Sequence, residues 1–456
     1  MERYDAIIIG FGKGGKTLAV DLANRNWKVA LIEKSSQMYG GTCINIGCIP
    51  TKTLVHKAKD AVGRGLTAYT DKQHFYEDAM SYKKQLVEFL RNKNYNNLAS
   101  NKNITIYNGN ASFLGPDEVL VTQKDGTVRL VSDKIFINTG SDSVIPDIPG
   151  IADNPYVYTS TSLLDLPSLP EKLIIIGGGY IGLEFASIYA SFGSKITVLE
   201  GNERLLPRED EDVAEAVKSV LEKRGVHFEF NVKVTSVDEK DGRVQVNWFD
   251  KQTKESALYE GTAILLATGR KPRTDDLNLS AAGIDVDKHG AIKVDQHLVT
   301  TNPNVRALGD VRGGLQFTYL SLDDYRIVID DLFGTGKRNT ADRYPISFSV
   351  FIDPPLSRVG MNQLDAEEAE LSYRIKTIPV QAIPRAHTLE EVDGLLKAVV
   401  EKNTDRILGC ILFCPESNEV INIVAMAMKM GVKATYLHEF IFTHPSMSEA
   451  LNDLFS

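Results

Sequence analysis

Apolar and polar positions follow each other in blocks that predict alternating strands and helices. Residues 4–33 begin with an apolar run ended by glycine, continue with an amphipathic stretch of helical spacing, and finish with a second apolar run ended by an acid. Residues 172–200 repeat this order. Short apolar strands joined through amphipathic helices are typical of α/β folds. The pattern therefore predicts two strand–helix–strand units in one chain.

Further apolar strands follow each unit and indicate an internal duplication. KIFINTG (134–140) and AILLATG (263–269) both end in Thr-Gly, one after each unit. A third short strand, NVRALGD (304–310), ends in Gly-Asp before a helical stretch that begins near Thr318. Residues 52–100 show apolar positions at three- and four-residue spacing, which predicts helix. Two such modules are thus expected to be interleaved along the chain.

The pattern changes from about residue 340. Four strand-like segments, ISFSVFI, YRIKTIPV, LLKAVVE and RILGCILF, precede helical stretches around 416–430 and 446–454. No glycine-rich loop occurs among them, so this part reads as a separate α+β domain. We expect a first module over 1–145 and 264–338, a second over 146–263, and a C-terminal domain over 339–456.

Each unit carries a glycine-rich turn between its first strand and its helix. The glycines and the acids that end the second strands are Gly10, Gly12, Gly15 and Glu33 in one unit, and Gly177, Gly179, Gly182 and Glu200 in the other. In both, 23 positions separate the first glycine from the acid. The glycines allow a tight turn, approach of backbone to a pyrophosphate and close helix packing, while the acid accepts from a ribose hydroxyl. The alternative is structural glycine in turns that bind nothing.

Composition and net charge limit the classes of partner that the protein is expected to bind. The chain has 456 residues, 43% hydrophobic and 24% charged, which leaves room for about three domains. A net charge of -9 disfavours nucleic acid and anionic membrane surfaces, since both select basic patches. The N-terminus lacks a signal-peptide pattern, and no uninterrupted run of 18 apolar residues occurs. We expect a cytoplasmic protein that acts on small solutes.

Four cysteines occur in two pairs. Cys43 and Cys48 would lie about 7.5 Å apart along a regular helix, beyond the roughly 4.4 to 6.8 Å Cα separation of a disulfide. The segment must therefore bend if they pair, and Gly47 supplies freedom for that bend. Pro50 suits the first turn of a helix that would place Cys48 at a dipole end favouring thiolate. A buried thiol pair or half of a zinc site is the alternative.

The other polar candidates stand near the C-terminus. HPSMSE places His444 on a proline-marked turn with Glu449 five residues later, near enough to orient the imidazole for proton transfer at neutral pH. A surface histidine beside a helix cap is the alternative. Cys410 and Cys414 alternate in an apolar strand, which predicts two core cysteines. No metal site is expected, because the remaining histidines show no ligand spacing.

These motifs together resemble the flavin-dependent disulfide reductases, which include dihydrolipoamide dehydrogenase, glutathione reductase and mercuric reductase. The resemblance covers the whole chain and rests on CINIGC (43–48), the two glycine turns, ATGR (267–270), the Gly-Asp strand end and HPSMSE (444–449). It implies two interleaved Rossmann-like domains, FAD on the first, a nicotinamide nucleotide on the second, and a C-terminal domain that makes a homodimer.

The resemblance also implies roles for single residues. Cys48 would be the sulfur against the flavin, where its thiolate acts as charge-transfer donor, and Cys43 the interchange sulfur that meets substrate. Lys52 and Glu184 would form an ion pair near the flavin ring. Tyr180 would cover the nicotinamide pocket, and His444 would reach the active site of the other subunit. The remaining cofactor-binding positions are Gly41, Thr42, Thr139, Gly140, Gly309, Asp310, Gly269 and Arg270.

The preference between NADH and NADPH is inferred from Glu200, which ends the second strand of the second module. Glu200 would accept from a free 2′-hydroxyl and repel a 2′-phosphate. Proteins similar to glutathione reductase place arginines where this chain has Gly201 and Pro207, although Arg204 and Arg208 lie close by. The expected electron donor is therefore NADH.

The acceptor is assigned by a narrower resemblance. CINIGCIPTKTLVH (43–56), GGLQFTYLSLDDYRI (313–327) and FTHPSMSEALNDLF (442–455) are similar to the reactive chlorine resistance flavoproteins, regarded as hypothiocyanous acid reductases. Some members reduce copper(II). Where lipoamide dehydrogenases carry Leu-Ala-His, this chain has Thr318-Tyr319-Leu320-Ser321. A small oxidant, most plausibly hypothiocyanous acid, is expected. Dihydrolipoamide, a low-molecular-weight disulfide, Cu(II) or Hg(II) remain alternatives on the same machinery, and a flavin-bound redox sensor is the alternative from another class.

Overall fold

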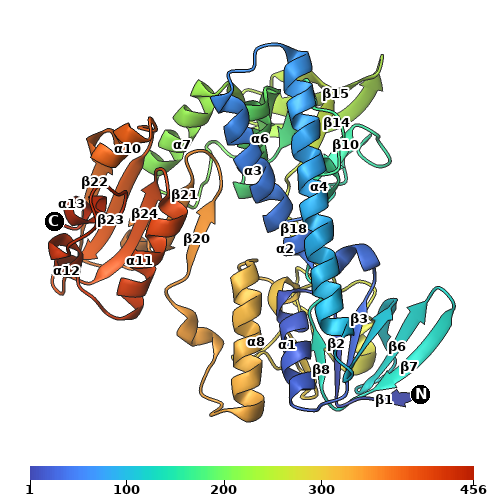
Figure 1. Cartoon of the computed structure of the whole chain (residues 1–456). Coiled ribbons are helices and arrows are strands. Elements are labelled where there is room, and N and C mark those ends of the chain that lie inside the picture. The colour runs from blue at the N-terminus through green and yellow to red at the C-terminus, as the bar shows by residue number, and fades with distance from the viewer. The chain divides into compact units, whose positions relative to one another are not determined.

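The computed structural model describes residues 1–456, which form two compact units (Figure 1). The first unit comprises Met1–Thr53, Asp78–Val144 and Gly269–Arg343, and the second comprises Leu54–Glu77, Ile145–Thr268 and Tyr344–Ser456. Two helices, α3 (Cys48–Gly63) and α4 (Tyr69–Ala99), carry the chain between them. The single helical region expected over 52–100 is thus two helices.

The first unit is built on a five-stranded parallel sheet in the order β19-β8-β2-β3-β4. Its strands are Ala6–Ile9 (β2), Val29–Glu33 (β3), Ile104–Asn108 (β4), Ile135–Ile137 (β8) and Val305–Ala307 (β19). On one face lie α1 (Lys13–Asn24) and α8 (Thr318–Phe333), side by side in Figure 1. The other face packs against a smaller sheet in the order β1-β7-β6-β5. Its strands are Glu2–Arg3 (β1), Asn110–Phe113 (β5), Glu118–Gln123 (β6) and Gly126–Val131 (β7).

The second unit holds a parallel sheet of corresponding order, β10-β17-β11-β12-β13. Its strands are Val157–Thr159 (β10), Lys172–Ile176 (β11), Lys195–Leu199 (β12), Val226–Glu229 (β13) and Ala263–Leu266 (β17). Helices α6 (Tyr180–Phe192) and α7 (Glu211–Lys223) follow β11 and β12, and an antiparallel sheet packs on the other face. That sheet consists of β14 (Val232–Lys240), β15 (Arg243–Asp250) and β16 (Ser256–Gly261). The predicted duplication extends to strand order.

The duplication also holds at the glycine that starts each turn. A Cβ on Gly10 would lie 2.3 Å from the carbonyl oxygen of Asn138, and one on Gly177 would lie 2.5 Å from that of Ala267. Both glycines have φ in the left-handed region, at 106° and 108°. The strand that ends in Thr-Gly therefore presses on the turn in each module, and only glycine fits there.

The expected domain boundary between 263 and 264 falls inside β17, which pairs with β11 along Ala263–Leu266. The chain divides after Thr268 instead, so AILLATG belongs entirely with the second sheet. The second unit also includes the C-terminal region as well as the second module. Strand pairing, which sequence patterns do not reveal, decides where such an interleaved chain divides.

The C-terminal region contains an antiparallel sheet in the order β20-β21-β24-β23-β22, with α11 (Ser417–Lys429) packed on β21 and β24. Its strands are Ser347–Val350 (β20), Leu356–Gly360 (β21), Tyr373–Pro379 (β22), Leu395–Glu401 (β23) and Ile407–Phe413 (β24). All four strand-like segments are confirmed, and β21 is an addition. Cys410 and Cys414 lie in the core as expected, where burial raises the pKa of both thiols.

The remaining elements are short. The last helix, α13 (Ala450–Leu454), is shorter than the expected 446–454 stretch, and α12 (Ala434–Glu439) was not expected. The others are β9 (Ser141–Ser143), β18 (Arg270–Pro272), α2 (Thr42–Asn45), α5 (Ser160–Leu163), α9 (Gln363–Glu368), α10 (Pro384–Thr388) and 3-10 turns at Ser36–Met38, Leu279–Ala282, Gly309–Arg312, Thr340–Arg343 and Val380–Ala382. No helix combines the length and apolar composition that crossing a bilayer requires.

Replacing Gly177 by alanine should destabilise the protein, because the new Cβ would collide with Ala267 at a φ that alanine rarely adopts. Such strain costs about 1 to 3 kcal/mol, before the collision itself. The change should appear as a lower midpoint of thermal unfolding.

Gly179→Ala is the matched control, since nothing lies within 4 Å of its built Cβ and its φ is -75°. Its unfolding midpoint should stay close to that of the original protein. Equal losses in the two variants would contradict the packing account.

Candidate functional site

The segment that carries the close cysteine pair lies directly against the first glycine turn. Gly41 has a φ of 78°, and a Cβ there would lie 2.6 Å from the Cα of Gly12. Gly41 is also the N-cap residue that directly precedes α2, and Cys43 is the second residue of α2. The backbone contact between two glycines therefore places Cys43 next to the predicted phosphate-binding turn.

The expected bend between the cysteines is present. Helix α2 ends at Asn45 and α3 begins at Cys48, so Ile46 and Gly47 separate two helices. Gly47 does not adopt a left-handed φ; its built Cβ would lie 3.1 Å from the carbonyl oxygen of Thr42, a tight approach. The bend thus needs a small residue rather than unusual backbone angles. Cys48 stands at the first turn of α3, as the sequence indicated.

The two cysteines are free thiols that share a hydrogen bond. That bond is the largest cause of a lowered pKa at Cys48, about 6, and of a raised pKa at Cys43. The positive charge of Lys52 lowers the pKa of Cys48 further. The first proton is therefore lost from Cys48, whose thiolate accepts a hydrogen bond from the Cys43 thiol.

Thr318 is a site residue that the sequence analysis treated as a helix start and as a departure from lipoamide dehydrogenases, without a role beside the thiols. Its Oγ1 lies 3.4 Å from the sulfur of Cys48, and its hydrogen bond lowers the pKa of that thiol. Thr318 is the first residue of α8, and the rings of Phe317 and Tyr319 on either side stack 5.2 Å apart. The sequence offered one signal for this role, which is a hydroxyl residue at the start of a helix after a glycine-rich loop.

Hydrogen bonds from residues of α1 and α4 hold the segment that carries Cys43 and Cys48. The side chain of Asn45 donates to the carbonyls of Tyr39 and Gly41, and its oxygen accepts from Arg91 Nε at 2.8 Å. Lys16 of α1 donates to the oxygen of Asn94 at 2.5 Å. Burial lowers the pKa of Lys16 to about 8. The cysteines thus sit on a segment braced by two helices.

The first turn fits the FAD that the sequence motifs imply. At the N-terminus of α1, Gly14 N donates to Ser321 Oγ at 3.1 Å and Gly15 N donates to Asn138 Oδ1 at 2.9 Å, so a phosphate here would be bound by the backbone N–H groups that precede Gly14. Glu33 accepts from the backbone N–H groups of Phe11 at 3.0 Å and Ser35 at 3.2 Å, and burial raises its pKa. An anchored acid beside a glycine turn that leads into a helix suits a ribose and a pyrophosphate.

Asn138 joins the first turn to the third strand end and was missed by the sequence analysis. Its side-chain oxygen accepts from Gly15 N at 2.9 Å, and its amide donates to the carbonyl of Leu308 at 2.7 Å. The Gly309 N–H in turn donates to the buried Asp324 at 2.6 Å, which Arg312 and Arg343 neutralise. These bonds fix the position at which the Gly-Asp pair turns.

Several of the predicted cofactor-binding residues come together around Ser141. Its hydroxyl donates to Asp310 at 3.1 Å, and Arg270 donates to the same hydroxyl at 3.0 Å. Burial raises the pKa of Asp310 and lowers that of Arg270. Thr139 donates to the carbonyl of Arg273 at 2.8 Å, and Gly140 follows with a φ of 79°. After Thr318 and Asn138, Ser141 is the third polar residue whose role sequence reasoning missed.

The second turn is open where a nucleotide would bind. A Cβ built on Gly179 or Gly269 would meet nothing within 4 Å, whereas one on Gly182 would lie 2.1 Å from the carbonyl oxygen of Gly177. Glu200 is 7% exposed and accepts from Gly178 N and from the backbone and side chain of Asn202, all at 2.7 Å. Glu33 and Glu200 therefore play matching parts in the two modules.

Two residues near the second turn are held by hydrogen bonds. Tyr180 is the first residue of α6, and its hydroxyl donates to Glu209 at 2.7 Å. Arg204 donates to the carbonyls of Glu209 at 3.1 Å and Pro207 at 3.0 Å. Its guanidinium is thus engaged within its own loop.

The structure gives the positions of the two residues of the expected ion pair and of the histidine expected to transfer protons. Lys52 lies in the first unit and Glu184 in the second, where it accepts from Phe351 N at 2.8 Å, so their pairing stays a prediction. His444 Nδ1 lies 2.8 Å from Glu449 Oε2, with the imidazole 72% exposed. Glu449 stands just before α13 instead of within it. The carboxylate orients an imidazole that faces away from its own subunit's interior.

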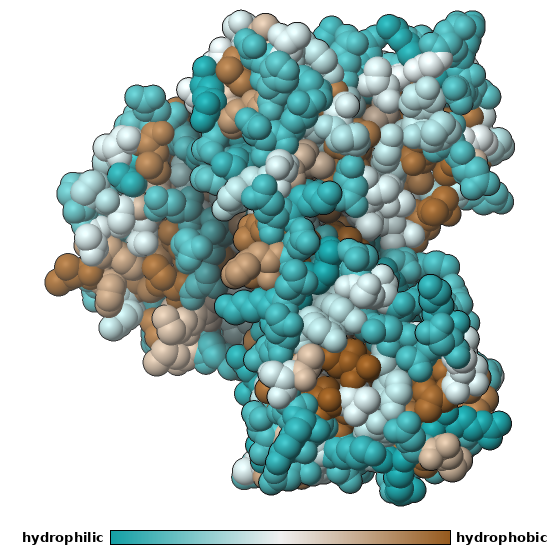
Figure 2. Space-filling model, turned by 45° about the vertical axis from the view of Figure 1, so that its right-hand side comes forward, coloured by the Kyte–Doolittle hydropathy of each residue, from teal (hydrophilic) through white to brown (hydrophobic).

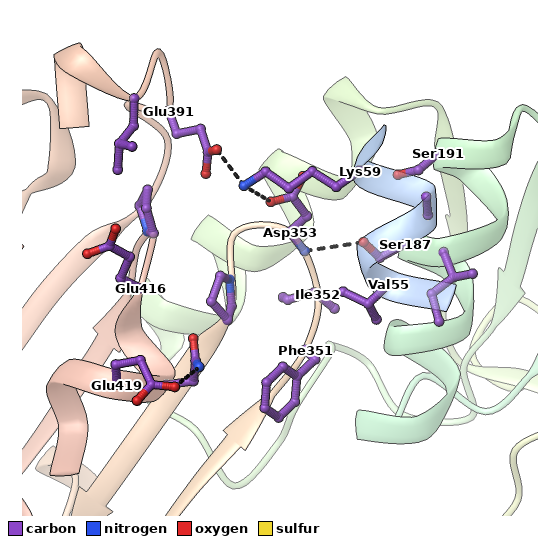
Figure 3. Close-up of a pocket in the computed structure, with 16 residues that line it drawn as sticks. Val55, Lys59, Ser187, Ser191, Phe351, Ile352, Asp353, Glu391, Glu416 and Glu419 are labelled. Atoms are coloured by element: carbon purple, nitrogen blue, oxygen red, sulfur yellow. Dashed lines mark hydrogen bonds and ion pairs between the residues drawn. The ribbon is translucent and has the colours of Figure 1, made fainter. Parts of the chain in front are cut away.

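A separate cavity of about 360 Å³ lies within the second unit (Figure 3). Lys59 crosses it to pair with Glu391 at 2.5 Å and Asp353 at 3.9 Å, and Phe351 and Ile352 line it. None of the predicted site residues lines this cavity. No group of three or more His, Cys, Asp and Glu side chains is arranged to hold a metal ion.

Comparison with known proteins assigns the family. Residues 4–324 match the model of pyridine nucleotide-disulphide oxidoreductases, and residues 346–455 match the dimerisation domain of the same family. Members of this family use FAD and a pyridine nucleotide, which agrees with both turns. The matched dimerisation domain supports a homodimer.

Relatives cover the whole chain. It is 51% identical to the probable pyridine nucleotide-disulfide oxidoreductase RclA of Escherichia coli, over 100% of this chain and 99% of that protein. It is 32% identical to mercuric reductase of Bacillus cereus and 31% identical to mitochondrial dihydrolipoyl dehydrogenase of Pisum sativum, over 98% and 99% of this chain and 70% and 91% of those proteins.

A solved structure also matches the whole chain. The Cu(II) complex of the HOCl-induced flavoprotein disulfide reductase RclA from Escherichia coli matches with a TM-score of 0.94 and 50% identity, over 100% of this chain and 99% of that one. Together with the paired thiols and the duplicated nucleotide-binding turns, these matches show that the chain belongs to the pyridine nucleotide-disulphide oxidoreductase family.

Proposed function

We propose that the protein is an NADH-dependent disulfide reductase whose Cys43–Cys48 pair reduces hypothiocyanous acid to thiocyanate. The observation that carries the proposal is the division of labour between the two thiols. Cys48 ionises first, with a pKa of about 6, while its hydrogen bond keeps the proton on Cys43. A redox pair that holds one thiolate at neutral pH is ready to transfer two electrons.

The reaction needs three acts from the chain. The Cys43–Cys48 disulfide would receive two electrons from NADH through the FAD that the first glycine turn and Glu33 would hold. The Cys43 sulfur then attacks the sulfur of hypothiocyanous acid, and the hydroxyl leaves as water with the thiol's proton. Cys48 attacks the resulting Cys43 sulfenyl thiocyanate, which releases thiocyanate and restores the disulfide. Two electrons leave the thiols and two enter the acceptor.

His444 and Glu449 are the proposed proton-transfer pair. Glu449 holds the Nδ1 side of the ring, so the opposite nitrogen is presented to solvent on an imidazole that is 72% exposed. In a homodimer each subunit's His444 would then take the Cys43 proton at the other subunit's redox site and return it to the leaving hydroxyl. Lys52 and Glu184 are proposed to pair near the flavin.

The domain roles follow the same proposal. Residues 1–145 and the chain after β17 to 338 would bind FAD, the second sheet would bind NADH, and residues 339–456 would form the dimer. Large apolar side chains exposed near the end of the chain support a partner there; they are Met426, Met430, Tyr436, Phe440 and Ile441. Figure 2 shows apolar patches within a mostly hydrophilic surface.

The relatives favour an oxidant as acceptor. The similar Escherichia coli protein is described as HOCl-induced, and a role in defence against reactive chlorine species follows for this chain if their functions agree. Cu(II) is the second candidate acceptor, because that protein and its C43S mutant have both been solved as Cu(II) complexes. A purified preparation tested with hypothiocyanous acid, Cu(II), Hg(II), lipoamide and glutathione disulfide would rank them by kcat/KM. Equal or higher kcat/KM for lipoamide would overturn the oxidant assignment.

Cys43→Ser should abolish multiple turnover with hypothiocyanous acid while NADH still reduces the flavin, because only the interchange sulfur meets the acceptor. Steady-state thiocyanate release and anaerobic flavin bleaching measure the two halves separately. Full turnover in this variant would refute the scheme.

Thr318→Val should raise the pKa of Cys48, since the thiolate loses a hydrogen-bond donor. A hydrogen bond to a charged group contributes about 1.5 to 3 kcal/mol, so the transition should move upward by at least about one pH unit. The thiolate is present above its pKa, so the charge-transfer absorption of the two-electron-reduced protein should rise near pH 6 in the original protein and later in the variant.

Thr318→Ser keeps the hydroxyl and is the matched control; its absorption profile should follow that of the original protein. Coinciding profiles for the valine and serine variants would show that the Thr318 hydroxyl does not stabilise the thiolate.

NADH should be preferred to NADPH by kcat/KM. Glu200 is buried and would face a 2′-phosphate with like charge, and the Arg204 guanidinium is engaged with backbone carbonyls. Steady-state kinetics with both nucleotides at one fixed acceptor concentration decide the point. A higher kcat/KM for NADPH would mean that Arg204 or Arg208 reorients to bind the phosphate.

A further inference from the structure

The Tyr180 hydroxyl is tied to a buried charge pair next to the second glycine turn. It donates to Glu209 Oε1 at 2.7 Å, and the tyrosine ring packs on Phe348 with centroids 5.5 Å apart. Tyr180 directly follows Gly179, where nothing lies within 4 Å of a built Cβ. The ring is therefore held at the open start of α6, where a nucleotide's phosphates are expected.

Glu209 is suited to hold this hydroxyl firmly. Its side chain is 1% exposed, and its second oxygen, Oε2, lies 3.3 Å from Arg358 NH1. Burial raises the pKa of Glu209, while the Arg358 charge and the Tyr180 hydrogen bond oppose that rise. A hydrogen bond from a phenol to a paired carboxylate in a dry site is stronger than one between neutral groups.

The C-terminal region fastens the loop that carries Glu209. Arg358 stands on β21 and also pairs with Asp365, and Asn362 donates to the carbonyl of Arg208 at 2.9 Å. The neighbouring Asp210 accepts from Lys397 Nζ at 2.9 Å, with Lys397 only 2% exposed. Glu209 therefore has little freedom to follow the tyrosine if the ring moves.

We propose that Glu209, paired with Arg358, is a positioning residue that latches Tyr180 over the nucleotide site until NADH displaces the ring. This inference rests on the proposed role of Tyr180 in covering the nicotinamide pocket. Nucleotide binding must then break the Tyr180–Glu209 hydrogen bond. The affinity for NADH is set partly by a charge pair that spans the second module and the C-terminal domain.

A double-mutant cycle tests the latch. The equilibrium Kd for NAD⁺, which does not reduce the flavin, is measured by calorimetry on FAD-loaded dimers of the original protein, Tyr180→Phe, Glu209→Gln and the double variant. Tyr180→Phe should tighten binding at least about tenfold, the size expected for one hydrogen bond to a charged group. Glu209→Gln should tighten it less, because the amide oxygen of glutamine still accepts from the Tyr180 hydroxyl but carries no charge. The double variant should gain no more than Tyr180→Phe alone, because both changes act on one interaction. Arg358→Gln should shift the Kd in the same direction.

Tyr259→Phe is the matched control. The Tyr259 hydroxyl also donates to a glutamate of the second unit, Glu229. Tyr259 itself lies on β16 and not at the glycine turn. Its Kd for NAD⁺ should stay unchanged, which separates the latch from a general loss of buried hydrogen bonds. An unchanged or weaker Kd in Tyr180→Phe or Glu209→Gln, or additive effects in the double variant, would overturn the latch. Failure of the proposed function itself would appear separately, as original protein that does not bind NAD⁺ or release thiocyanate.

Discussion

The backbone contact between Gly41 and Gly12 is the constraint on which the redox chemistry depends. The absent Cβ of Gly41 would stand 2.6 Å from the Cα of Gly12, so any side chain would push the cysteine segment off the first turn. The same glycine is the N-cap of α2, the helix that carries Cys43. One contact thus brings the thiol pair and the predicted FAD phosphates to the same helix terminus. Asn45 and Arg91 then hold the segment in place from the other side.

The duplicated modules solve one packing problem twice and then diverge. In both, a Thr-Gly strand end presses on the first glycine and an acid accepts from the backbone of the turn. The two modules differ in the residue that precedes the Thr-Gly pair. Asn138 ties the first turn to the Gly309–Asp310 strand end, whereas Ala267 leaves the corresponding place apolar. The first module therefore has polar anchors for a long cofactor, while the second keeps an open turn at Gly179 that suits a nucleotide which binds and leaves.

Sequence patterns predicted both turns, the duplicated strand–helix–strand units, the bend at the cysteines and the buried Cys410 and Cys414, because each depends on local periodicity or spacing. Thr318, Asn138 and Ser141 escaped prediction, because they lie far from their partners along the chain and have ordinary polar side chains. The division after Thr268 escaped for the same reason, since strand pairing decides it. Residue roles that depend on both units or on a second subunit, such as the Lys52–Glu184 pair and His444, remain proposals.

The central claim is that two electrons reach hypothiocyanous acid through Cys43 and Cys48. Anaerobic two-electron-reduced protein, mixed with one equivalent of hypothiocyanous acid per site and then mapped by mass spectrometry, tests it most directly. The account predicts one thiocyanate released per site and a Cys43–Cys48 disulfide in the same fraction of molecules. Thiocyanate release with both thiols still free would contradict it, because the electrons would then have bypassed the pair.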